Sequence, residues 1–296
     1  MKEIENNFKD SAKMIFSEVI KKKTFFIIFS AYIFFGGIGF TSCNTSDKLS
    51  IDKGTSISLI GNNLGARMMH YGYFETQIQL TFPDSLLVIR NLCDAGNTPG
   101  FRPHSGRNDP WAFPGASQFQ DALAQETGSK GNFETPDQWL DRLDTDLIIS
   151  FFGFNESFED STGLALFMDE LHAFINHIQA QKYNDHEAPT LVLVSPIAFQ
   201  DLSKTEDLPD GIEINRRLKM YTKAMAQVAL EEKIPFIDVF TPSTKWFLDK
   251  KLTIDGVQLN EEGYRIFSSF LSNALFDRVR KGKEIDFDEL RARVLD

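Results

Sequence analysis

The hydrophobic residues of this chain follow two alternating patterns. Short runs that are apolar at nearly every position alternate with longer segments in which apolar residues lie three or four positions apart. The first pattern predicts strands that are buried on both faces, and the second predicts amphipathic helices. The predicted strands are residues 57–60, 86–89, 147–152, 191–194 and 236–239. The predicted helices are residues 64–80, 164–181, 214–231 and 261–279.

This alternation of strands and helices predicts an α/β fold. Strands that are apolar on both faces belong in a parallel sheet with helices on each side. We therefore expect a three-layer α/β/α sandwich around a five-stranded parallel sheet. Residues 56–280 contain no internal repeat and no Pro- or Ser-rich linker, which favours a single domain. Residues 281–296 form a charged, helix-prone C-terminal tail.

Residues 99–136 interrupt the pattern with a segment rich in Gly, Pro, Arg, Asn and Asp. A loop of this length inside a compact α/β domain is usually functional. Because it follows the second predicted strand, we expect it to lie over the carboxyl ends of the strands, where open parallel sheets bind ligands. We interpret residues 99–136 as a lid-like insertion.

The N-terminal segment differs in character from the rest of the chain. Three lysines at positions 21–23 precede an uncharged, mostly apolar stretch, residues 24–40, which is typical of an export signal. Residues 40–43 (Phe-Thr-Ser-Cys) resemble a bacterial lipobox, with Phe40 where Leu is usual. We predict a lipoprotein signal peptide over residues 1–42, a lipid on Cys43 and a tether over residues 43–55. The alternative is an uncleaved anchor, although a full span needs about 20 apolar residues.

The charge balance and the cysteine count narrow the function classes. The chain has 31 basic and 42 acidic residues and a net charge of −11, which argues against a nucleic-acid partner because phosphate binding needs clustered Lys and Arg. Two cysteines form at most one disulfide, and no Cys or His spacing typical of a metal site occurs. We therefore predict neither a metal nor a cofactor. The expected location is the bacterial cell envelope, in the periplasm or at the cell surface, with the lipid holding the protein to a membrane.

Four short polar blocks lie where the predicted strands end or the last helix begins. They are residues 60–64 (Ile-Gly-Asn-Asn-Leu), 91–97 (Asn-Leu-Cys-Asp-Ala-Gly-Asn), 153–156 (Gly-Phe-Asn-Glu) and 255–260 (Asp-Gly-Val-Gln-Leu-Asn). In order and placement these blocks resemble those of the SGNH/GDSL hydrolases. The resemblance implies a flavodoxin-like fold and a lineage of ester hydrolases, for which O-acyl carbohydrate esters are the expected substrates.

The resemblance assigns a role to individual positions. Gly96 of the second block and Asn155 of the third match the residues that form the oxyanion hole, and Asp255 matches the acid of the triad. Asn63 stands in the serine slot and Gln258 in the histidine slot.

Two of the three reacting groups are thereby replaced by carboxamides. The amide nitrogen of Asn63 has its lone pair delocalised into the carbonyl and cannot attack an ester as an activated hydroxyl does. The side chain of Gln258 cannot take up a proton near neutral pH and cannot act as a general base. We therefore expect impaired catalysis and a role in binding a glycan or an acylated saccharide. Two alternatives stay open: an active carbohydrate esterase with a non-standard nucleophile or water, and a structural subunit of an envelope complex.

Candidate ligand contacts come from the first block and from the insertion. Charged side chains and an indole ring beside a pocket suit a polar or sugar ligand. The candidates are Asn62, Arg102, His104, Arg107 and Trp111. His104 and Ser105 are also the first places to look for a replacement base or nucleophile.

Overall fold

The computed structural model describes residues 48–103, 109–120, 133–277 and 286–296. The predicted signal peptide (residues 1–42), the lipidation site Cys43, and the insertion residues His104, Ser105 and Arg107 lie outside the described residues. Within the described ranges, no helix is both long enough and apolar enough to cross a bilayer.

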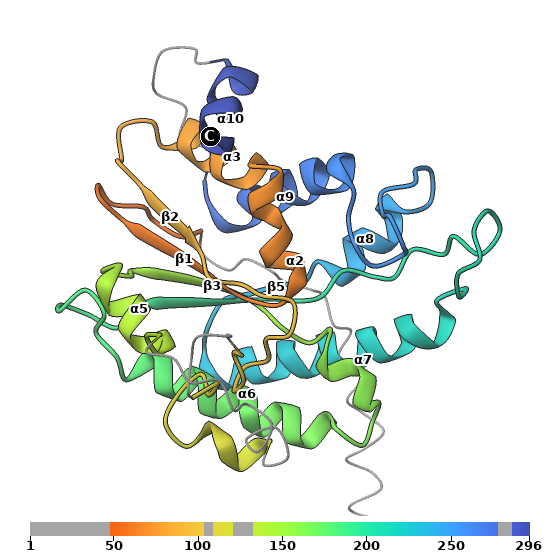
Figure 1. Cartoon of the computed structure of the whole chain (residues 1–296), viewed down its shortest axis with the longest axis horizontal. Coiled ribbons are helices and arrows are strands. Elements are labelled where there is room, and N and C mark those ends of the chain that lie inside the picture. Colours follow the sequence, from red (N-terminus) through yellow and green to blue (C-terminus); the bar gives the residue numbers. More distant parts are fainter. Residues whose placement is uncertain (1–47, 104–108, 121–132, 278–285) are drawn as a thin grey trace, which may run out of the picture. The chain divides into compact units, whose positions relative to one another are not determined.

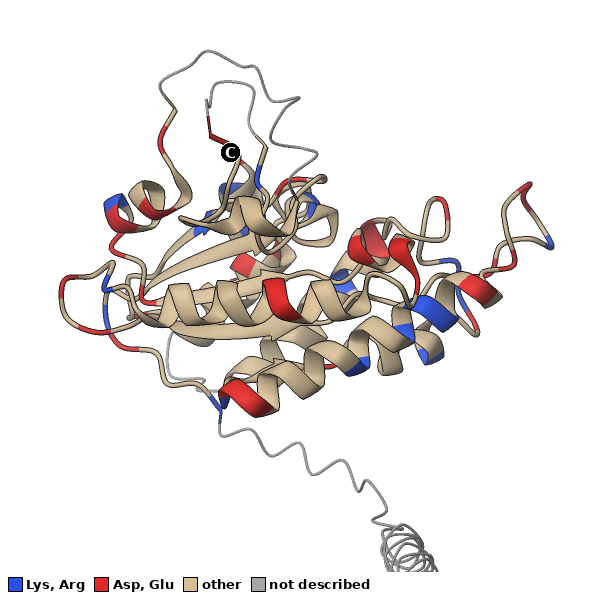
Figure 2. Ribbon diagram, turned by 90° about the horizontal axis from the view of Figure 1, so that it is seen from below, with Lys and Arg blue, Asp and Glu red and all other residues tan. Residues whose placement is uncertain are grey.

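Five parallel strands form a sheet in the order β2-β1-β3-β4-β5 (Figure 1). The strands are β1 (Ser56–Gly61), β2 (Val88–Asn91), β3 (Leu147–Phe151), β4 (Thr190–Val194) and β5 (Phe236–Ile237). All five predicted strands are present, and the predicted five-stranded parallel sheet is confirmed. Every residue of β1 and β3 is buried, as expected for central strands that are covered on both faces. Charged residues lie on helices and loops, whereas β1, β3, β4 and β5 carry none (Figure 2).

Helices connect the strands and continue to the C-terminus. The α-helices are α2 (Asn63–Ala66), α3 (Tyr73–Thr81), α5 (Pro136–Arg142), α6 (Leu164–Gln179), α7 (Ile212–Glu232), α8 (Phe240–Trp246), α9 (Glu261–Leu275) and α10 (Phe287–Leu295). Three short 3-10 helices are η1 (Arg67–His70), η2 (Ala116–Phe119) and η3 (Glu156–Glu159).

The two faces of the sheet pack against different helices, which gives the predicted three layers (Figure 1). Along β1, Ile57 and Leu59 contribute to a core shared with α3 and α9, whereas Ile60 contributes to a second core shared with α6 and α7. This alternation follows from the geometry of a strand, in which successive side chains point to opposite faces.

Two predicted elements differ from the structure in their bounds. The predicted helix 64–80 is interrupted at Gly72, whose φ of 65° is left-handed, so α2 and η1 precede the break and α3 follows it. The predicted strand 86–89 is shifted along the chain. Leu86 has a φ of 52° and is 67% exposed, and pairing with β1 begins at Val88.

The described part of the insertion packs against a helix. Ala112, Phe113 and Ala116 join the core that contains the buried side chains of α6. The carboxylate of Glu170 on α6 accepts hydrogen bonds from the backbone N–H of Gly100 (3.1 Å), the Thr98 hydroxyl (3.2 Å) and the Gln120 amide (2.8 Å). These contacts hold residues 98–100 and 112–120 to the α6 layer.

Candidate functional site

The first block forms a tight turn at the carboxyl end of β1. Gly61 has a φ of 129°, and a Cβ atom built on it would lie 2.1 Å from the backbone oxygen of Phe151. Only glycine fits this close approach of two strands. Asn62 follows and caps α2, because its side-chain oxygen accepts a hydrogen bond from the N–H of Leu64 at 3.2 Å. The next residue, Asn63, is thereby placed at the N-terminus of α2.

The fourth block keeps the hydrogen bond that orients a catalytic base. One carboxylate oxygen of Asp255 accepts from the backbone N–H groups of Val257 (3.0 Å) and Gln258 (2.7 Å). The other oxygen accepts from Nε2 of Gln258 at 2.9 Å. In a triad, the acid accepts an imidazole N–H in the same manner. The Gln258 amide therefore makes the contact of a triad histidine to its acid, without the proton affinity of an imidazole.

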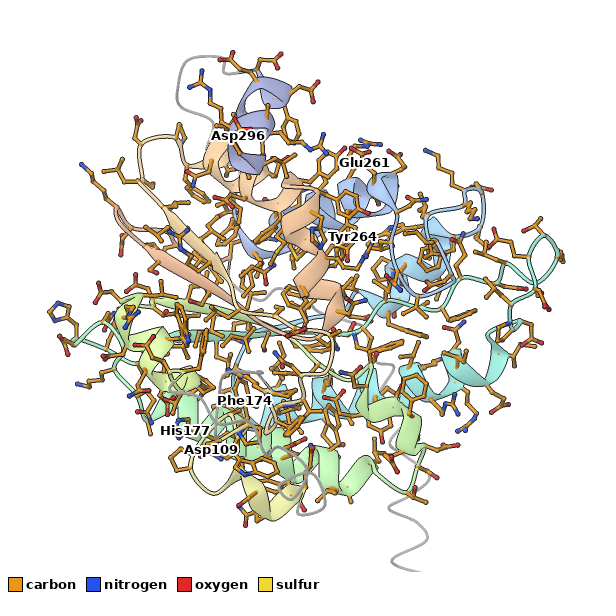
Figure 3. All side chains as sticks on the ribbon, viewed as in Figure 1. Asp109, Phe174, His177, Glu261, Tyr264 and Asp296 are labelled. Atoms are coloured by element: carbon orange, nitrogen blue, oxygen red, sulfur yellow. The ribbon has the colours of Figure 1, made fainter. Side chains whose placement is uncertain are left out.

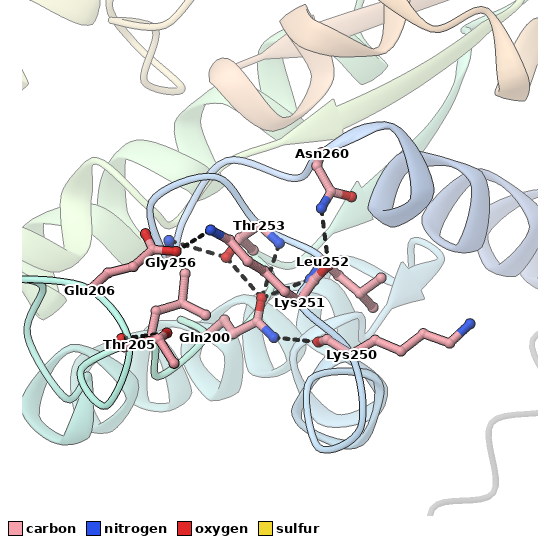
Figure 4. A network of polar contacts seen from close by, with 10 residues as sticks. Gln200, Thr205, Glu206, Lys250, Lys251, Leu252, Thr253, Gly256 and Asn260 are labelled. Atoms are coloured by element: carbon pink, nitrogen blue, oxygen red, sulfur yellow. Dashed lines mark hydrogen bonds and ion pairs between the residues drawn. The ribbon is translucent and has the colours of Figure 1, made fainter.

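A buried glutamine, Gln200, fixes the loop that carries this block (Figure 4). Its side-chain oxygen accepts from the backbone N–H of Leu252 (3.0 Å), and from both the N–H (3.0 Å) and the hydroxyl (2.9 Å) of Thr253. Its Nε2 donates to the backbone oxygen of Lys250 at 2.6 Å, and its backbone N–H donates to the oxygen of Gly256 at 2.8 Å. Gln200 is 3% exposed, so these bonds are shielded from water.

The first and fourth blocks meet at one small cavity of about 30 Å³. Its polar lining includes Asn62, Asn63 and Gln258, all three of which end in carboxamides. The rest of its lining is mainly apolar, with Leu64, Phe151, Phe152, Phe154, Ser195, Pro196, Ile197, Val257 and Tyr264. Among the described residues, none makes a hydrogen bond with the Asn63 side chain. Asn63 and Gln258, the residues assigned to the serine and histidine slots, thus line one cavity.

The hydroxyl groups at this cavity are committed to the backbone. Ser195 donates to the oxygen of Pro196 at 3.0 Å and accepts from the N–H groups of Val239 (2.8 Å) and Phe240 (3.1 Å). The Tyr264 hydroxyl donates to the oxygen of Leu64 at 3.0 Å, and burial raises its pKa. Figure 3 shows Tyr264 above the sheet, close to α2.

None of the histidines that the structure describes is placed to act as a base at the small cavity. No described histidine lines the cavity. His172 pairs with Glu231 and Glu232, and His177 bonds the carboxylate of Asp137 at 2.9 Å on the far side of the α6 layer. No described side chain at the cavity therefore has the chemistry of an activated nucleophile or of a general base at neutral pH.

The two oxyanion-hole positions lie in a neighbouring loop cluster. Nδ2 of Asn155 donates to the backbone oxygens of Ala95 (3.0 Å) and Asn97 (2.9 Å). Both N–H groups of this amide are thus used to tie the third block to the second. Gly96 lies between those two acceptors and is exposed, and neither Gly96 nor Asn155 lines the small cavity.

Buried acids support the same region. Glu156, next to Asn155, accepts from the backbone N–H of Gly153 at 2.8 Å, and burial raises its pKa to about 8. Burial also raises the pKa of Glu170 to about 6, against the opposing effect of its hydrogen bonds to Gly100, Thr98 and Gln120.

The described ligand candidates from the insertion do not reach the small cavity. Arg102 is 6% exposed, and its guanidinium lies 5.4 Å from the centroid of the Phe174 ring. Phe174 belongs to α6 and is labelled in Figure 3. Trp111 packs edge to face on Phe101 at 5.6 Å. Of the described residues, no group of three or more His, Cys, Asp or Glu side chains is arranged to hold a metal ion.

Sequence reasoning missed Gln200 and the role of Asn97. Gln200 lies in the loop after β4, where a glutamine is usually exposed to solvent. The sequence alone therefore does not reveal that its side chain is buried. Asn97 was part of the second block, but its side chain was given no role. Its Nδ2 donates to the backbone oxygen of Gly61 at 3.1 Å and so joins the first and second blocks.

Comparisons with known proteins agree with this geometry. The family model described as "GDSL-like Lipase/Acylhydrolase family" matches residues 98–266, which include Asn155, Asp255 and Gln258. The first block precedes the matched range. A comparison with curated proteins found no matching sequence.

Solved structures with the same fold include esterases. A catalytic mutant of Axe2, an acetylxylan esterase from Geobacillus stearothermophilus, is 15% identical with a TM-score of 0.51, over 79% of this chain and 100% of that one. A putative GDSL-like lipase from Parabacteroides merdae is 14% identical with a TM-score of 0.50, over 77% of this chain and 98% of that one. A gut microbial diltiazem-metabolizing enzyme is 11% identical with a TM-score of 0.51, over 76% of this chain and 48% of that one. At these identities the likeness shows the fold.

Proposed function

The chain belongs to the GDSL-like lipase/acylhydrolase family, and we propose that within it this protein binds an acylated saccharide without hydrolysing the ester at an appreciable rate. The observation that carries the proposal is the small cavity at which Asn63 and Gln258 meet. The hydrogen bond from Gln258 to Asp255 keeps the arrangement of a triad, while neither carboxamide performs the chemistry of a serine or a histidine. Loss of the nucleophile or the base of a serine hydrolase costs about six orders of magnitude in kcat.

The size and lining of the cavity favour a small acyl group. A volume of about 30 Å³ corresponds to roughly one or two water molecules, so an acetyl group suits it better than a sugar ring. The mainly apolar lining suits the methyl end of an acetyl group. The carboxamide of Asn63, which has no hydrogen-bond partner among the described residues, is positioned to donate to the ester carbonyl.

The saccharide part of the proposal draws on the fold likeness. Axe2, which shares the fold, is an acetylxylan esterase. The acetyl group of an acetylated carbohydrate is small enough to match the volume of the cavity. The proposal extends to location: lipidation at Cys43 and a place at the membrane of the cell envelope rest on residues 21–43 of the sequence.

A gain-of-function experiment tests the proposal. The Asn63→Ser/Gln258→His double variant restores a nucleophile and a base beside Asp255. Its hydrolysis of 4-nitrophenyl acetate and of acetylated xylooligosaccharides is compared with that of the unaltered protein. Asn63→Ala/Gln258→Ala is the matched control, because it removes both carboxamides without adding a reacting group. We expect the double variant to exceed the unaltered protein by at least about 100-fold, and the control to remain at the blank.

Two outcomes would contradict the proposal. Hydrolysis by the unaltered protein well above the blank, abolished in the alanine control, would identify an active esterase that works through these carboxamides or through a water that they hold. A double variant that folds but stays inert would mean that Asn63 and Gln258 do not occupy the positions of a nucleophile and a base.

A further inference from the structure

A second and larger cavity, of about 300 Å³, lies at the carboxyl end of the edge strand β2. It is lined by Asn91, Leu92, Cys93, Asp94, Asn97, Arg102, Pro103, Phe133, Pro136 and Trp139. None of these residues lines the small cavity of Asn63 and Gln258. Its volume is at the lower end of the range of small-molecule sites, which is about 300–1,000 Å³.

Asn97 contributes to the lining with a side chain in a fixed orientation. It is 2% exposed, and its Nδ2 donates to the oxygen of Gly61 at 3.1 Å, which fixes the orientation of the amide. Its Oδ1 is buried and accepts no hydrogen bond from any described residue, so a ligand in the cavity does not reach it. The polar contact that the cavity offers a ligand therefore comes from a more exposed group of the lining.

The lining also contains an aromatic residue, Trp139, which belongs to a capped helix. Thr135 and Gln138 form a capping box, in which the Thr135 hydroxyl accepts from the Gln138 N–H at 3.3 Å and the Gln138 oxygen accepts from the Thr135 N–H at 2.9 Å. Trp139 follows directly and is half-buried, and the guanidinium of Arg142 lies 5.6 Å from the centroid of its ring. These contacts hold the indole in a defined position at the cavity.

The charges at the cavity are of both signs. Asp94 is exposed, and one of its oxygens accepts from the N–H of Ala95 at 2.7 Å, which leaves the other oxygen as an acceptor. Arg102 supplies a buried cation to the same lining. A net anionic ligand would meet Asp94 and a net cationic ligand would meet Arg102, so the lining favours a neutral ligand with several hydrogen-bonding groups.

We infer that this cavity binds the ring of a neutral saccharide. A sugar ring carries several hydroxyl groups, so it can donate to the oxygen of Asp94 that the Ala95 N–H does not use. The C–H face of the same ring is apolar and suits contact with Trp139. Binding here requires neither Asn63 nor Gln258, so this inference and the proposed function fail independently.

The test is calorimetric titration of the purified full-length protein with xylotriose and chitobiose, neither of which carries an O-acyl ester. Trp139→Ala removes the aromatic ring and Trp139→Phe conserves one. Phe158→Ala is the matched control, because Phe158 is an aromatic residue that is 61% exposed and lies outside the cavity lining.

We expect at least one of the two oligosaccharides to bind, and Trp139→Ala to weaken that binding about tenfold or more, as for the loss of an aromatic anchor. Trp139→Phe and Phe158→Ala are expected to stay within about threefold of the unaltered protein. The inference is overturned if neither oligosaccharide binds, if Trp139→Ala binds as well as Phe158→Ala, or if adenosine, a stacking ligand of another class, binds more tightly than both.

Discussion

The buried carboxyl group of Glu156 gives a prediction about stability whose size follows from the structure. Glu156 is 9% exposed, one of its oxygens accepts from the Gly153 N–H at 2.8 Å, and its other oxygen is buried without a hydrogen-bond partner among the described residues. Burial raises its pKa from the ordinary 4.5 to about 8 in the folded protein, and the negative charge of the buried Glu170 adds to this rise. The folded state therefore holds a proton that the unfolded chain releases at much lower pH.

The sign and the size of the effect follow from this difference in pKa. Because the folded pKa is the higher one, the contribution to stability is fully present below pH 4.5 and is lost as the pH rises toward about 8. Each pKa unit corresponds to about 1.4 kcal/mol, so the complete loss is on the order of 5 kcal/mol. This is a large part of the total stability of an ordinary domain, which is about 5–15 kcal/mol.

The perturbation is Glu156→Gln, which removes the ionisation and keeps an oxygen for the Gly153 N–H. The new amide nitrogen takes the place of the unpartnered oxygen, so at pH 5.0 the variant should be equal to or less stable than the unaltered protein. At pH 8.5 it should be relatively more stable, and the difference between the two proteins should change by about 4 kcal/mol between the two pH values.

Urea unfolding followed by circular dichroism at both pH values measures this change. Glu159→Gln is the matched control, because Glu159 belongs to the same 3-10 turn and is exposed. Its free energy of unfolding should follow that of the unaltered protein at both pH values. If the curves for Glu156→Gln and the unaltered protein run parallel from pH 5.0 to 8.5, the carboxyl group is ionised in the folded state and the reasoning is refuted.

Three further predictions concern the turn, the insertion and the C-terminus. Gly61→Ala should destabilise the fold by about 3 kcal/mol or more in thermal unfolding, because its Cβ would lie 2.1 Å from a backbone oxygen of β3; an unchanged melting temperature would contradict this close approach. Glu170→Ala should speed amide hydrogen exchange at Gly100 about tenfold, since that N–H loses its acceptor, and an unchanged rate would mean that Glu170 does not hold the insertion. Arg291→Ala should cost about 1–2 kcal/mol in urea unfolding, because Arg291 bonds the oxygen of Tyr71 at 2.7 Å and so anchors α10; a change below the error of the measurement would show that α10 adds nothing.

The sheet was predictable from the sequence because its strands are buried on both faces. In a short run such as residues 147–152, every residue except Ser150 is apolar, as expected for a strand that is covered on both faces. The helix predicted over residues 64–80 was less well defined. Its apolar spacing continues through Gly72, but a single left-handed residue redirects the chain without disturbing that spacing.

The candidate site was predictable in its residues but not in its hydrogen bonds. Asn63 follows β1 and Gln258 lies in the loop before α9, and both line one cavity in the structure. The side chain of Asn155 donates to two backbone oxygens of the second block. The spacing of residues along the sequence does not reveal which backbone oxygens lack a hydrogen bond from the helices and strands. The same is true of Gln200, whose bonds go chiefly to the backbone of a loop 50 or more residues away.

The hydrogen bonds of Asn155 set a limit on what restoring the triad can achieve. A serine at position 63 and a histidine at position 258 would supply the nucleophile and the base, and Asp255 already holds the side chain at position 258. Both N–H groups of Asn155 are bonded to backbone oxygens, so one of these bonds must break before the amide can donate to an oxyanion. Absence of one oxyanion donor costs about 100- to 1,000-fold in kcat. The double variant should therefore gain activity yet remain below a complete triad by about that factor. Asn155→Ala in the double-variant background tests this limit. If it lowers kcat by 100-fold or more, the amide is free to donate after all; if it changes kcat by only a few-fold, the amide is committed to the second block.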